Sequence, residues 1–277
     1  MAKRRKRKNK RNQQIISWII FFIMVIFAVY QWGKPNHAND TNNNPDTTQN
    51  AGTANTPYGG LSKTDYQKLA NLNFKSGGQA YVYVNNNHST LIKNAWKVNK
   101  VIYSNLDNLN RTSSSNTAFL ERRNVADQSL RVRQYVDPTG WHSNRRNGVQ
   151  IYNRGHLIAY SVSAGIDQDG NYNPANKSGD QNNPKNLFTQ SAFTNQKIQT
   201  IFESKVRKAL RQGYKVIYQA TPIFRGNELM ARGINLQAIS LAGNLDFNVY
   251  IFNVQPNYTF NYANGRARID RNMYVNE

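Results

Sequence analysis

The sequence contains no cysteine among its 277 residues. Disulfide bonds, thiolate metal sites and a cysteine nucleophile are therefore excluded. Stability must come from an ordinary hydrophobic core. Any metal ion must be bound through histidine, carboxylate or amide ligands.

Acidic residues are also scarce, with 15 Asp and Glu against 36 Lys and Arg, and the isoelectric point is near 10.2. The first twelve residues hold eight basic side chains and no acid. From Tyr58 onward, 27 Lys and Arg still stand against 13 Asp and Glu, a net charge of +14. This excess suggests a polyanionic partner, either nucleic acid or an anionic membrane surface. A basic surface that only maintains solubility is the alternative.

The N-terminus joins a basic tail, residues 1–12, to a long apolar segment, residues 13–32. The apolar run spans 18 residues when its terminal Trp32 is counted, near the lower limit for crossing a bilayer. We predict a transmembrane signal anchor at 13–32, with the tail in the cytoplasm and the rest of the chain outside. A cleaved signal peptide, which would give a secreted protein, is the alternative. The apolar core of such a peptide is usually about 7–15 residues long and ends at a small-x-small site, which is not seen here.

Residues 33–57 are rich in Asn, Thr, Asp and Ala and contain almost no large apolar residue. Such a segment cannot bury enough surface to fold, so we predict a disordered linker. Residues 58–277 then form the folded domain, in which we find no internal repeat.

Hydrophobic periodicity and turn residues predict the elements of this domain. Helices are expected at 61–72 and 192–211, and a long loop at 165–186. Strands are expected at 79–84, 96–103, 150–160, 214–221 and 246–254, with a hairpin at 259–269. The fold class predicted from this order is α+β, with a mixed, mainly antiparallel sheet.

The predicted helix 192–211 carries two neighbouring stripes. Apolar residues recur at every fourth position and should face the core: Ile198, Phe202, Val206 and Leu210. Asn195, Gln199 and Glu203 have the same spacing, which places an amide and a carboxylate at the edge of the buried face. A merely solvated flank of the helix is the alternative for this polar stripe.

His156 stands out among the histidines of the domain because it follows Arg154 and Gly155 in an otherwise apolar strand. Arg154, two residues away, should project to the same face of that strand. A neutral imidazole can take a proton from water near neutral pH, and an arginine can hold a phosphate. A lone histidine is more often structural, so the setting alone leaves both readings open.

The segment Asn153-Arg154-Gly155-His156 resembles the D-R-G-H signature of the DNA/RNA non-specific endonucleases, a ββα-metal (His-Me finger) family. Four further segments are similar to the membrane DNA-entry nuclease branch of that family: 140–142, 183–187, 190–196 and 202–210. The resemblance implies a ββα-metal finger after the anchor. It also implies a Mg²⁺-dependent, sequence-non-specific DNA endonuclease, with Mn²⁺ as an alternative ion and RNA as a further substrate. DNA uptake or degradation would be its role.

The resemblance also implies a role for each matching residue. His156 corresponds to the general base, and Asn195 to the direct metal ligand. Glu203 corresponds to the carboxylate that orients metal-bound water, and Asn186 to a second asparagine near metal and base. Arg154 joins this catalytic set as the residue that can hold a phosphate.

Three basic residues follow the polar stripe along the helix and are candidate phosphate contacts: Arg207, Lys208 and Arg211. Stabilisation of the helix C-terminus by their charge is the alternative. Asn153 departs from the family signature, because it keeps a hydrogen-bond acceptor but lacks the charge of aspartate. A catalytically weak or inactive surface receptor for DNA is therefore the second candidate function.

Overall fold

The computed structural model describes residues 56–277 except 144 and 147. These residues fall within one compact unit of the chain, Gln49–Glu277. The predicted tail 1–12 and anchor 13–32 lie outside the described residues, as does nearly all of the linker 33–57. Within the described part, no helix combines the length and the apolar character needed to cross a membrane.

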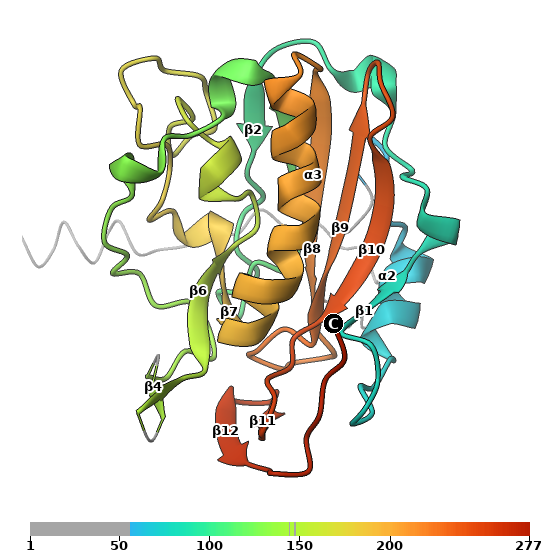
Figure 1. Ribbon diagram of the computed structural model, residues 1–277, viewed down its shortest axis with the longest axis vertical. Coiled ribbons are helices and arrows are strands. Elements are labelled where there is room, and N and C mark those ends of the chain that lie inside the picture. Colours follow the sequence, from blue (N-terminus) through green and yellow to red (C-terminus); the bar gives the residue numbers. More distant parts are fainter. Residues whose placement is uncertain (1–55, 144, 147) are drawn as a thin grey trace, which may run out of the picture. The chain divides into compact units, whose positions relative to one another are not determined.

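A six-stranded antiparallel sheet in the order β1-β10-β9-β8-β3-β2 forms the centre of the domain (Figure 1). Its strands are β1 Tyr81–Tyr83, β2 Lys100–Ile102, β3 Asn116–Leu120, β8 Val216–Ile223, β9 Gly233–Ser240 and β10 Asp246–Phe252. Three two-stranded pairs lie outside it: β4 Arg145–Arg146 with β5 Val149–Gln150, β6 Tyr152–His156 with β7 Leu187–Ser191, and β11 Tyr258–Asn261 with β12 Arg266–Ile269. The predicted α+β class with mainly antiparallel pairing is confirmed.

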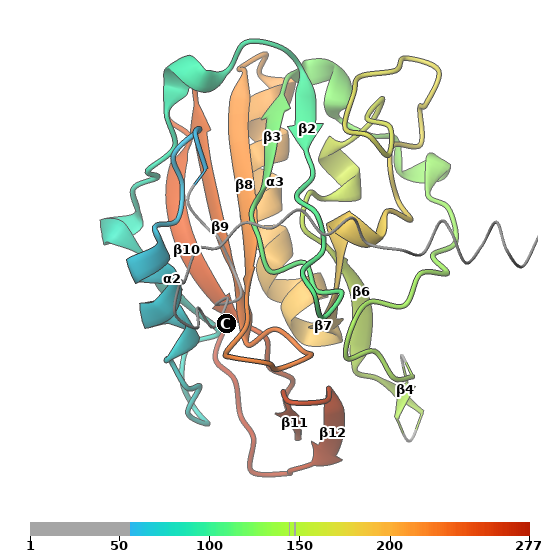
Figure 2. The ribbon, with the colours of Figure 1, turned by 180° about the vertical axis from the view of Figure 1, so that it is seen from behind.

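Helices α3, Thr200–Arg211, and α2, Lys63–Ala70, cover opposite faces of this sheet (Figures 1 and 2). The apolar stripe of α3 shares a core cluster with Ile251 of β10, whereas α2 shares another with Tyr250. Neighbouring residues of a strand point to opposite faces, so β10 separates the two apolar layers. Burial of the apolar stripe fixes which side of α3 remains for polar contacts.

The β6–β7 pair runs beside α3 and leads directly into it, which gives a ββα arrangement. In its register, Asn153 lies opposite Gln190 and His156 opposite Leu187. The connection 157–186 holds two short 3-10 helices, Tyr160–Val162 and Pro184–Asn186. Further 3-10 helices lie at Asn85–Asn87, Lys93–Ala95, Arg122–Asn124 and Gln128–Leu130.

The helix predicted at 192–211 is present but has two windings. Thr194–Gln199 is a π-helix, and the α-helix begins only at Thr200. Thr194 anchors the wide turns to the end of β10, because its hydroxyl donates to the carbonyl of Phe252 at 2.9 Å and accepts from the amide of Val254 at 3.2 Å. π-Helical turns are rare and frequently mark functional sites.

The expected strands and the hairpin at 259–269 are confirmed, although most are shorter than predicted. The sequence patterns do not predict β3 and β9, which lie inside the sheet. Two buried positions of β9 are occupied by an asparagine and a glutamine, and each side chain has a hydrogen-bond partner. Asn235 donates to Asn248 at 2.8 Å, and Gln237 accepts from the amide of Thr90 at 2.9 Å. Such satisfied polar residues interrupt the hydrophobic pattern that a buried strand normally shows.

Candidate active site

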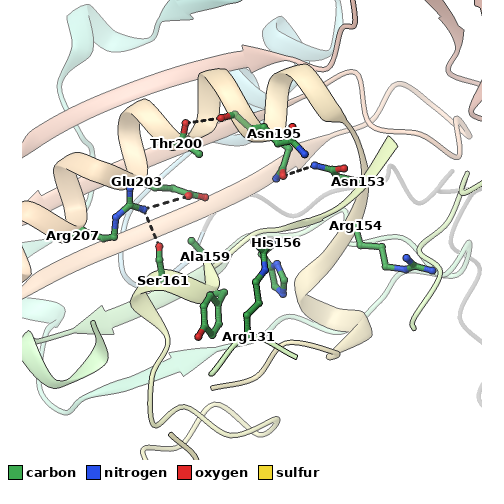
Figure 3. Close-up of a pocket in the computed structure, with 12 residues that line it drawn as sticks. Arg131, Asn153, Arg154, His156, Ala159, Ser161, Asn195, Thr200, Glu203 and Arg207 are labelled. Atoms are coloured by element: carbon green, nitrogen blue, oxygen red, sulfur yellow. Dashed lines mark hydrogen bonds and ion pairs between the residues drawn. The ribbon is translucent and has the colours of Figure 1, made fainter. Parts of the chain in front are cut away.

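An open pocket with a volume of about 460 Å³ lies where β6 meets the two-part helix (Figure 3). Its wall is made by Arg131, Asn153, Arg154, His156, Ala159, Tyr160, Ser161, Asn195, Gln196, Thr200, Glu203 and Arg207. The structure therefore brings together most of the site residues predicted from the sequence. The exceptions are Asn186, Lys208 and Arg211.

His156 ends β6 and is only 9 % exposed. Its Nε2 lies 3.1 Å from the carbonyl oxygen of Gln181. A carbonyl can only accept, so Nε2 carries the ring proton and Nδ1 keeps a lone pair. The pKa of His156 is lowered to about 4, mainly because the ring is buried. The hydrogen bond to Gln181 opposes this shift, and the positive charge of Arg131 adds a smaller lowering of the pKa. The imidazole is therefore neutral near pH 7 and able to accept a proton.

This burial makes stability depend on pH. The pKa of His156 is about 4 in the folded chain against an ordinary value of 6.5, so below pH 6.5 protons bind the unfolded chain first. The folded state then loses stability as the pH falls through this window, by about 3 kcal/mol at its acid end. Urea unfolding at pH 7 and pH 4.5 should show a larger loss for the wild type than for His156→Gln. Equal losses in the two proteins would contradict this assignment.

Buried side-chain amides connect Asn195 with Glu203, and we call Asn195, Gln190 and Gln199 the amide chain. Asn195 Nδ2 donates to Gln190 Oε1 at 2.9 Å, and Gln190 Nε2 donates to Gln199 Oε1 at 2.8 Å. Gln199 Nε2 donates to Glu203 Oε1 at 2.8 Å and to the carbonyl of His156 at 3.0 Å. This carbonyl only accepts, so it fixes the orientation of Gln199 and of each amide before it. Asn195 therefore turns its oxygen, and not its nitrogen, toward Asn153.

Gly155 makes room for the amide chain. A Cβ atom at this position would lie 2.2 Å from Gln190 Oε1 and 2.8 Å from Gln190 Cβ. Gln190 is fully buried, so a methyl group at residue 155 could be accommodated only by displacing the Gln190 side chain from its hydrogen bonds. The glycine of the motif thus allows close approach of a side chain from the paired strand.

Glu203 faces the pocket from α3, one α-helical turn before Arg207. Burial raises the pKa of its carboxyl group, while the Gln199 hydrogen bond and the charge of Arg207 oppose this shift. Arg207 Nη1 lies 3.7 Å from Glu203 Oε2 and donates to Ser161 Oγ at 2.9 Å (Figure 3). These contacts hold a guanidinium at the pocket wall, where it can bind phosphate.

The other two predicted phosphate contacts lie elsewhere. Lys208 and Arg211 are exposed and do not line the pocket. Lys208 instead borders a separate hollow shared with the turn between β9 and β10. Successive residues of a helix point in different directions, so Arg207 can reach the pocket while Lys208 cannot.

Arg154 lines the pocket, but its guanidinium is already engaged. Its Nε donates to the carbonyl of Val136 at 2.6 Å, and its Nη2 contacts Asp137 Oδ1 at 2.5 Å. The guanidinium also stacks on Trp141, and Figure 3 shows it turned away from His156. In contrast to the sequence-based expectation, Arg154 ties the 136–141 segment to β6, because that segment supplies both an acid and an aromatic ring.

Asn186 also differs from its expected place. It is fully buried, its Oδ1 accepts from the amide of Ile158 at 2.8 Å, and its Nδ2 donates to the carbonyl of Ile158 at 3.0 Å. Both ends of its amide are thus used by the main chain. Asn186 joins the two ends of the connection 157–186 and so acts on the positions of β6 and β7, not at the pocket wall.

Two residues near His156 are not marked by any sequence motif. Arg131 lines the pocket, and Gln134 Nε2 lies 3.3 Å from Nε2 and 3.5 Å from Nδ1 of His156. Both residues lie between the 3-10 helix Gln128–Leu130 and strand β4, outside the 153–156 motif. The only feature of the sequence that could have pointed to this segment is that basic residues alternate with other residues around Arg131, and such a pattern is common on protein surfaces.

The donor atoms at the pocket suit a hard cation. Among the described residues, no group of three or more His, Asp and Glu side chains is arranged to hold a metal ion. The helix side of the pocket instead offers the amide oxygen of Asn195 and the carboxylate of Glu203, beside the side-chain oxygens of Gln196 and Thr200. Mg²⁺ keeps several of its waters and accepts few protein ligands, so this small oxygen set fits it.

Comparison with known proteins places this site in a family. The model of a family described as DNA/RNA non-specific endonuclease matches residues 89–241, which include every residue of the pocket. The crystal structure of NucA from Streptococcus agalactiae with a magnesium ion bound is similar over 76% of this chain and 98% of that chain, with 31% identity and a TM-score of 0.59. The metal-free structure of NucA matches at 31% identity and a TM-score of 0.56, over 75% of this chain and 97% of that chain.

The zinc-bound structure of Sda1 nuclease shares the fold at 20% identity and a TM-score of 0.51, over 68% of this chain and 95% of that chain. The family model covers more than half of the sequence, and the NucA match extends over most of the described residues. Fold, pocket and relatives therefore agree, and the chain belongs to the DNA/RNA non-specific endonuclease family as an endonuclease.

Proposed function

We propose that this endonuclease is anchored in the membrane, depends on Mg²⁺ and hydrolyses DNA with little sequence preference. The observation that carries the proposal is that His156, Asn195, Glu203 and Arg207 line one pocket in a ββα unit. The similarity to NucA, which binds a magnesium ion, supports the choice of ion. Mn²⁺ has the same preference for oxygen ligands and should replace it. RNA is a further substrate class, in keeping with the description of the family.

His156 acts as the general base in this proposal. Its Nδ1 accepts a proton from the attacking water, while its Nε2–H donates to the carbonyl oxygen of Gln181, with 3.1 Å between nitrogen and oxygen. That hydrogen bond keeps the ring from rotating. Because burial lowers its pKa to about 4, the base is unprotonated at neutral pH.

Asn195 would hold the cation directly and Glu203 through water. When bound, Mg²⁺ supplies positive charge that stabilises the charge developing on the phosphate. Arg207 adds a second positive group and binds phosphate oxygens, with Ser161 keeping its guanidinium in place at 2.9 Å. Gln190 and Gln199 are positioning residues, since they fix the atom that Asn195 presents.

Supercoiled plasmids of unrelated sequence provide the test. The full-length protein, purified in a mild detergent, should degrade each of them in Mg²⁺ to a smear without discrete bands. Excess EDTA should stop the reaction, and Mg²⁺ or Mn²⁺ should restore it. Intact plasmid in Mg²⁺ would overturn the proposal, and discrete fragments would overturn its lack of sequence preference.

A catalytically weak or inactive receptor for DNA is the second candidate. It is favoured by Asn153, whose Nδ2 donates to Asn195 Oδ1 at 2.8 Å, the same oxygen that is proposed to bind the cation. This candidate predicts DNA binding that weakens steeply with salt but no cleavage. Gel retardation beside the plasmid assay separates the two functions.

We also propose that residues 13–32 anchor the protein, with the N-terminus in the cytoplasm and the nuclease domain outside the cell. The length and apolar character of this run support the proposal. The protein should stay with the membranes during carbonate extraction, and protease added to intact cells should digest the domain. A shortened protein in the medium would instead show that the anchor is cleaved.

Gly155→Ala should lower nuclease activity by disturbing the amide chain behind the pocket wall. The new methyl group would displace Gln190, which lies within 2.2 Å of it, and so break the bond that orients Asn195. Loss of a residue that orients a metal ligand lowers affinity or activity about 10- to 100-fold, and we expect a loss in this range. Plasmid nicking rates measure it, with far-UV circular dichroism as the control for folding. Wild-type activity in a folded Gly155→Ala protein would contradict the role of the amide chain.

A further inference from the structure

Asn153 is the one position where the motif departs from the family signature, and the structure shows what the asparagine does there. Its Nδ2 donates to Asn195 Oδ1 at 2.8 Å, and its Oδ1 accepts from Gln150 Nε2 at 2.5 Å. The direction of the hydrogen bond from Asn153 to Asn195 is fixed by the other end of the amide chain, where Gln199 donates to the carbonyl of His156. The nitrogen of Asn195 is committed to Gln190 at 2.9 Å, so only its oxygen is left for Asn153. An oxygen only accepts, and Asn153 must therefore present its nitrogen.

We propose that Asn153 competes with the divalent cation for Asn195 Oδ1 and thereby sets the affinity of this chain for the ion. The inference rests on the proposed function, which places the cation at Asn195. An amide hydrogen and a cation seek the same lone pairs of one oxygen. A cation must therefore displace the Asn153 hydrogen bond or bind next to its partial positive charge.

An aspartate at the same position would act in the opposite way. Its carboxylate has no hydrogen to donate, so it would face Asn195 Oδ1 as one acceptor against another. Two facing acceptors repel each other unless positive charge lies beside them. The aspartate of the family signature thus favours a cation at this place, whereas Asn153 satisfies the oxygen without one.

The charge of the pocket strengthens this contrast. Three arginines and a single carboxylate line it: Arg131, Arg154, Arg207 and Glu203. Part of this positive charge is neutralised, because Arg154 contacts Asp137 and Arg207 lies 3.7 Å from Glu203. A second carboxylate at residue 153 would double the number of acids on the wall. The change from asparagine to aspartate therefore adds attraction and removes a competitor at once.

Mn²⁺ binding, followed through the electron paramagnetic resonance signal of the free ion, tests the proposal without any measurement of activity. The full-length protein in detergent is compared with Asn153→Asp, Asn153→Ala and Asn195→Ala. Asn244→Asp is the matched control, since it makes the same change in charge at an exposed residue outside the pocket. Partners of metal ligands change metal affinity by about 10- to 100-fold, so the dissociation constant of Asn153→Asp should fall by that factor.

Asn153→Ala should bind Mn²⁺ more tightly than the wild type but less tightly than Asn153→Asp, because it removes the competing hydrogen without adding charge. Asn244→Asp should bind as the wild type does. An unchanged or weaker affinity in either variant of Asn153 would overturn the competition. The alanine variant is informative even if the aspartate variant fails to fold.

Asn195→Ala separates this inference from the proposed function. Loss of Mn²⁺ binding in Asn195→Ala, together with tighter binding in Asn153→Asp, supports both. If Asn195→Ala binds Mn²⁺ like the wild type, the cation site of the proposed function is wrong, and the inference fails with it. If Asn195→Ala loses binding but Asn153→Asp equals the wild type, only the inference is overturned.

Discussion

Replacement of His156 by alanine is expected to reduce plasmid cleavage about 100- to 10,000-fold, the usual contribution of a general base. The residue is 9 % exposed, the main-chain carbonyl of Gln181 holds its ring in one orientation, and the other residues that line the pocket include no second imidazole to replace it. DNA binding should persist, because the arginines of the pocket are unchanged. Initial rates of plasmid nicking in Mg²⁺ measure the loss, and gel retardation in EDTA measures binding.

His142→Ala is the matched control for this experiment. His142 is exposed, its Nε2 lies 2.8 Å from the carbonyl of Asn264, and it does not line the pocket. This variant should cleave at the wild-type rate. A His156→Ala protein that cleaves as fast as His142→Ala would remove the base from the proposed mechanism.

Asn195→Ala is expected to slow plasmid cleavage strongly and to change the response of the cleavage rate to Mg²⁺. Loss of a partner that only supports a ligand costs about 10- to 100-fold in metal affinity, so loss of the proposed ligand itself should reach at least about 100-fold. The Mg²⁺ concentration for half-maximal cleavage should rise accordingly. Rates measured across a Mg²⁺ series, with Asn244→Ala as the exposed control, give both quantities. An unchanged half-maximal concentration would show that Asn195 is not a ligand.

Much of the fold could be predicted from hydrophobic periodicity. The stripe that includes Phe202 predicts the buried face of the long helix, and Asn195 and Glu203 lie at the edge of that face as expected, whereas Gln199 is fully buried. Strand β9 could not be found in this way, because the polar residues Asn235 and Gln237 are buried in it and form hydrogen bonds there. Gln237 accepts from the amide of Thr90, which lies 147 residues away in the chain, so no local pattern reports this bond.

The part of the site that could be predicted from the sequence is the part that a motif or the spacing along a helix identifies. His156, Asn195 and Glu203 were recognised by the motif and the helical spacing, and the structure brings them to one pocket. Arg154 and Asn186 lie otherwise than expected because their partners come from the tertiary structure. Arg154 meets an acid 17 residues earlier in the chain, and Asn186 meets the main chain 28 residues away.

The π-helical start of the long helix has a consequence for how this enzyme can vary. Thr194–Gln199 is wound more widely than the α-helix that follows, and both of its ends are held, one by the β10 end and the other by the core stripe. Removal of one residue from this segment would tighten it into an ordinary α-helix and rotate Asn195 away from Glu203. The segment should therefore tolerate exchange of side chains far better than a change in length. A single-residue gap at 194–199 would then mark, in any related sequence, a protein that keeps the fold but no longer has the counterparts of Asn195 and Glu203 on one pocket wall.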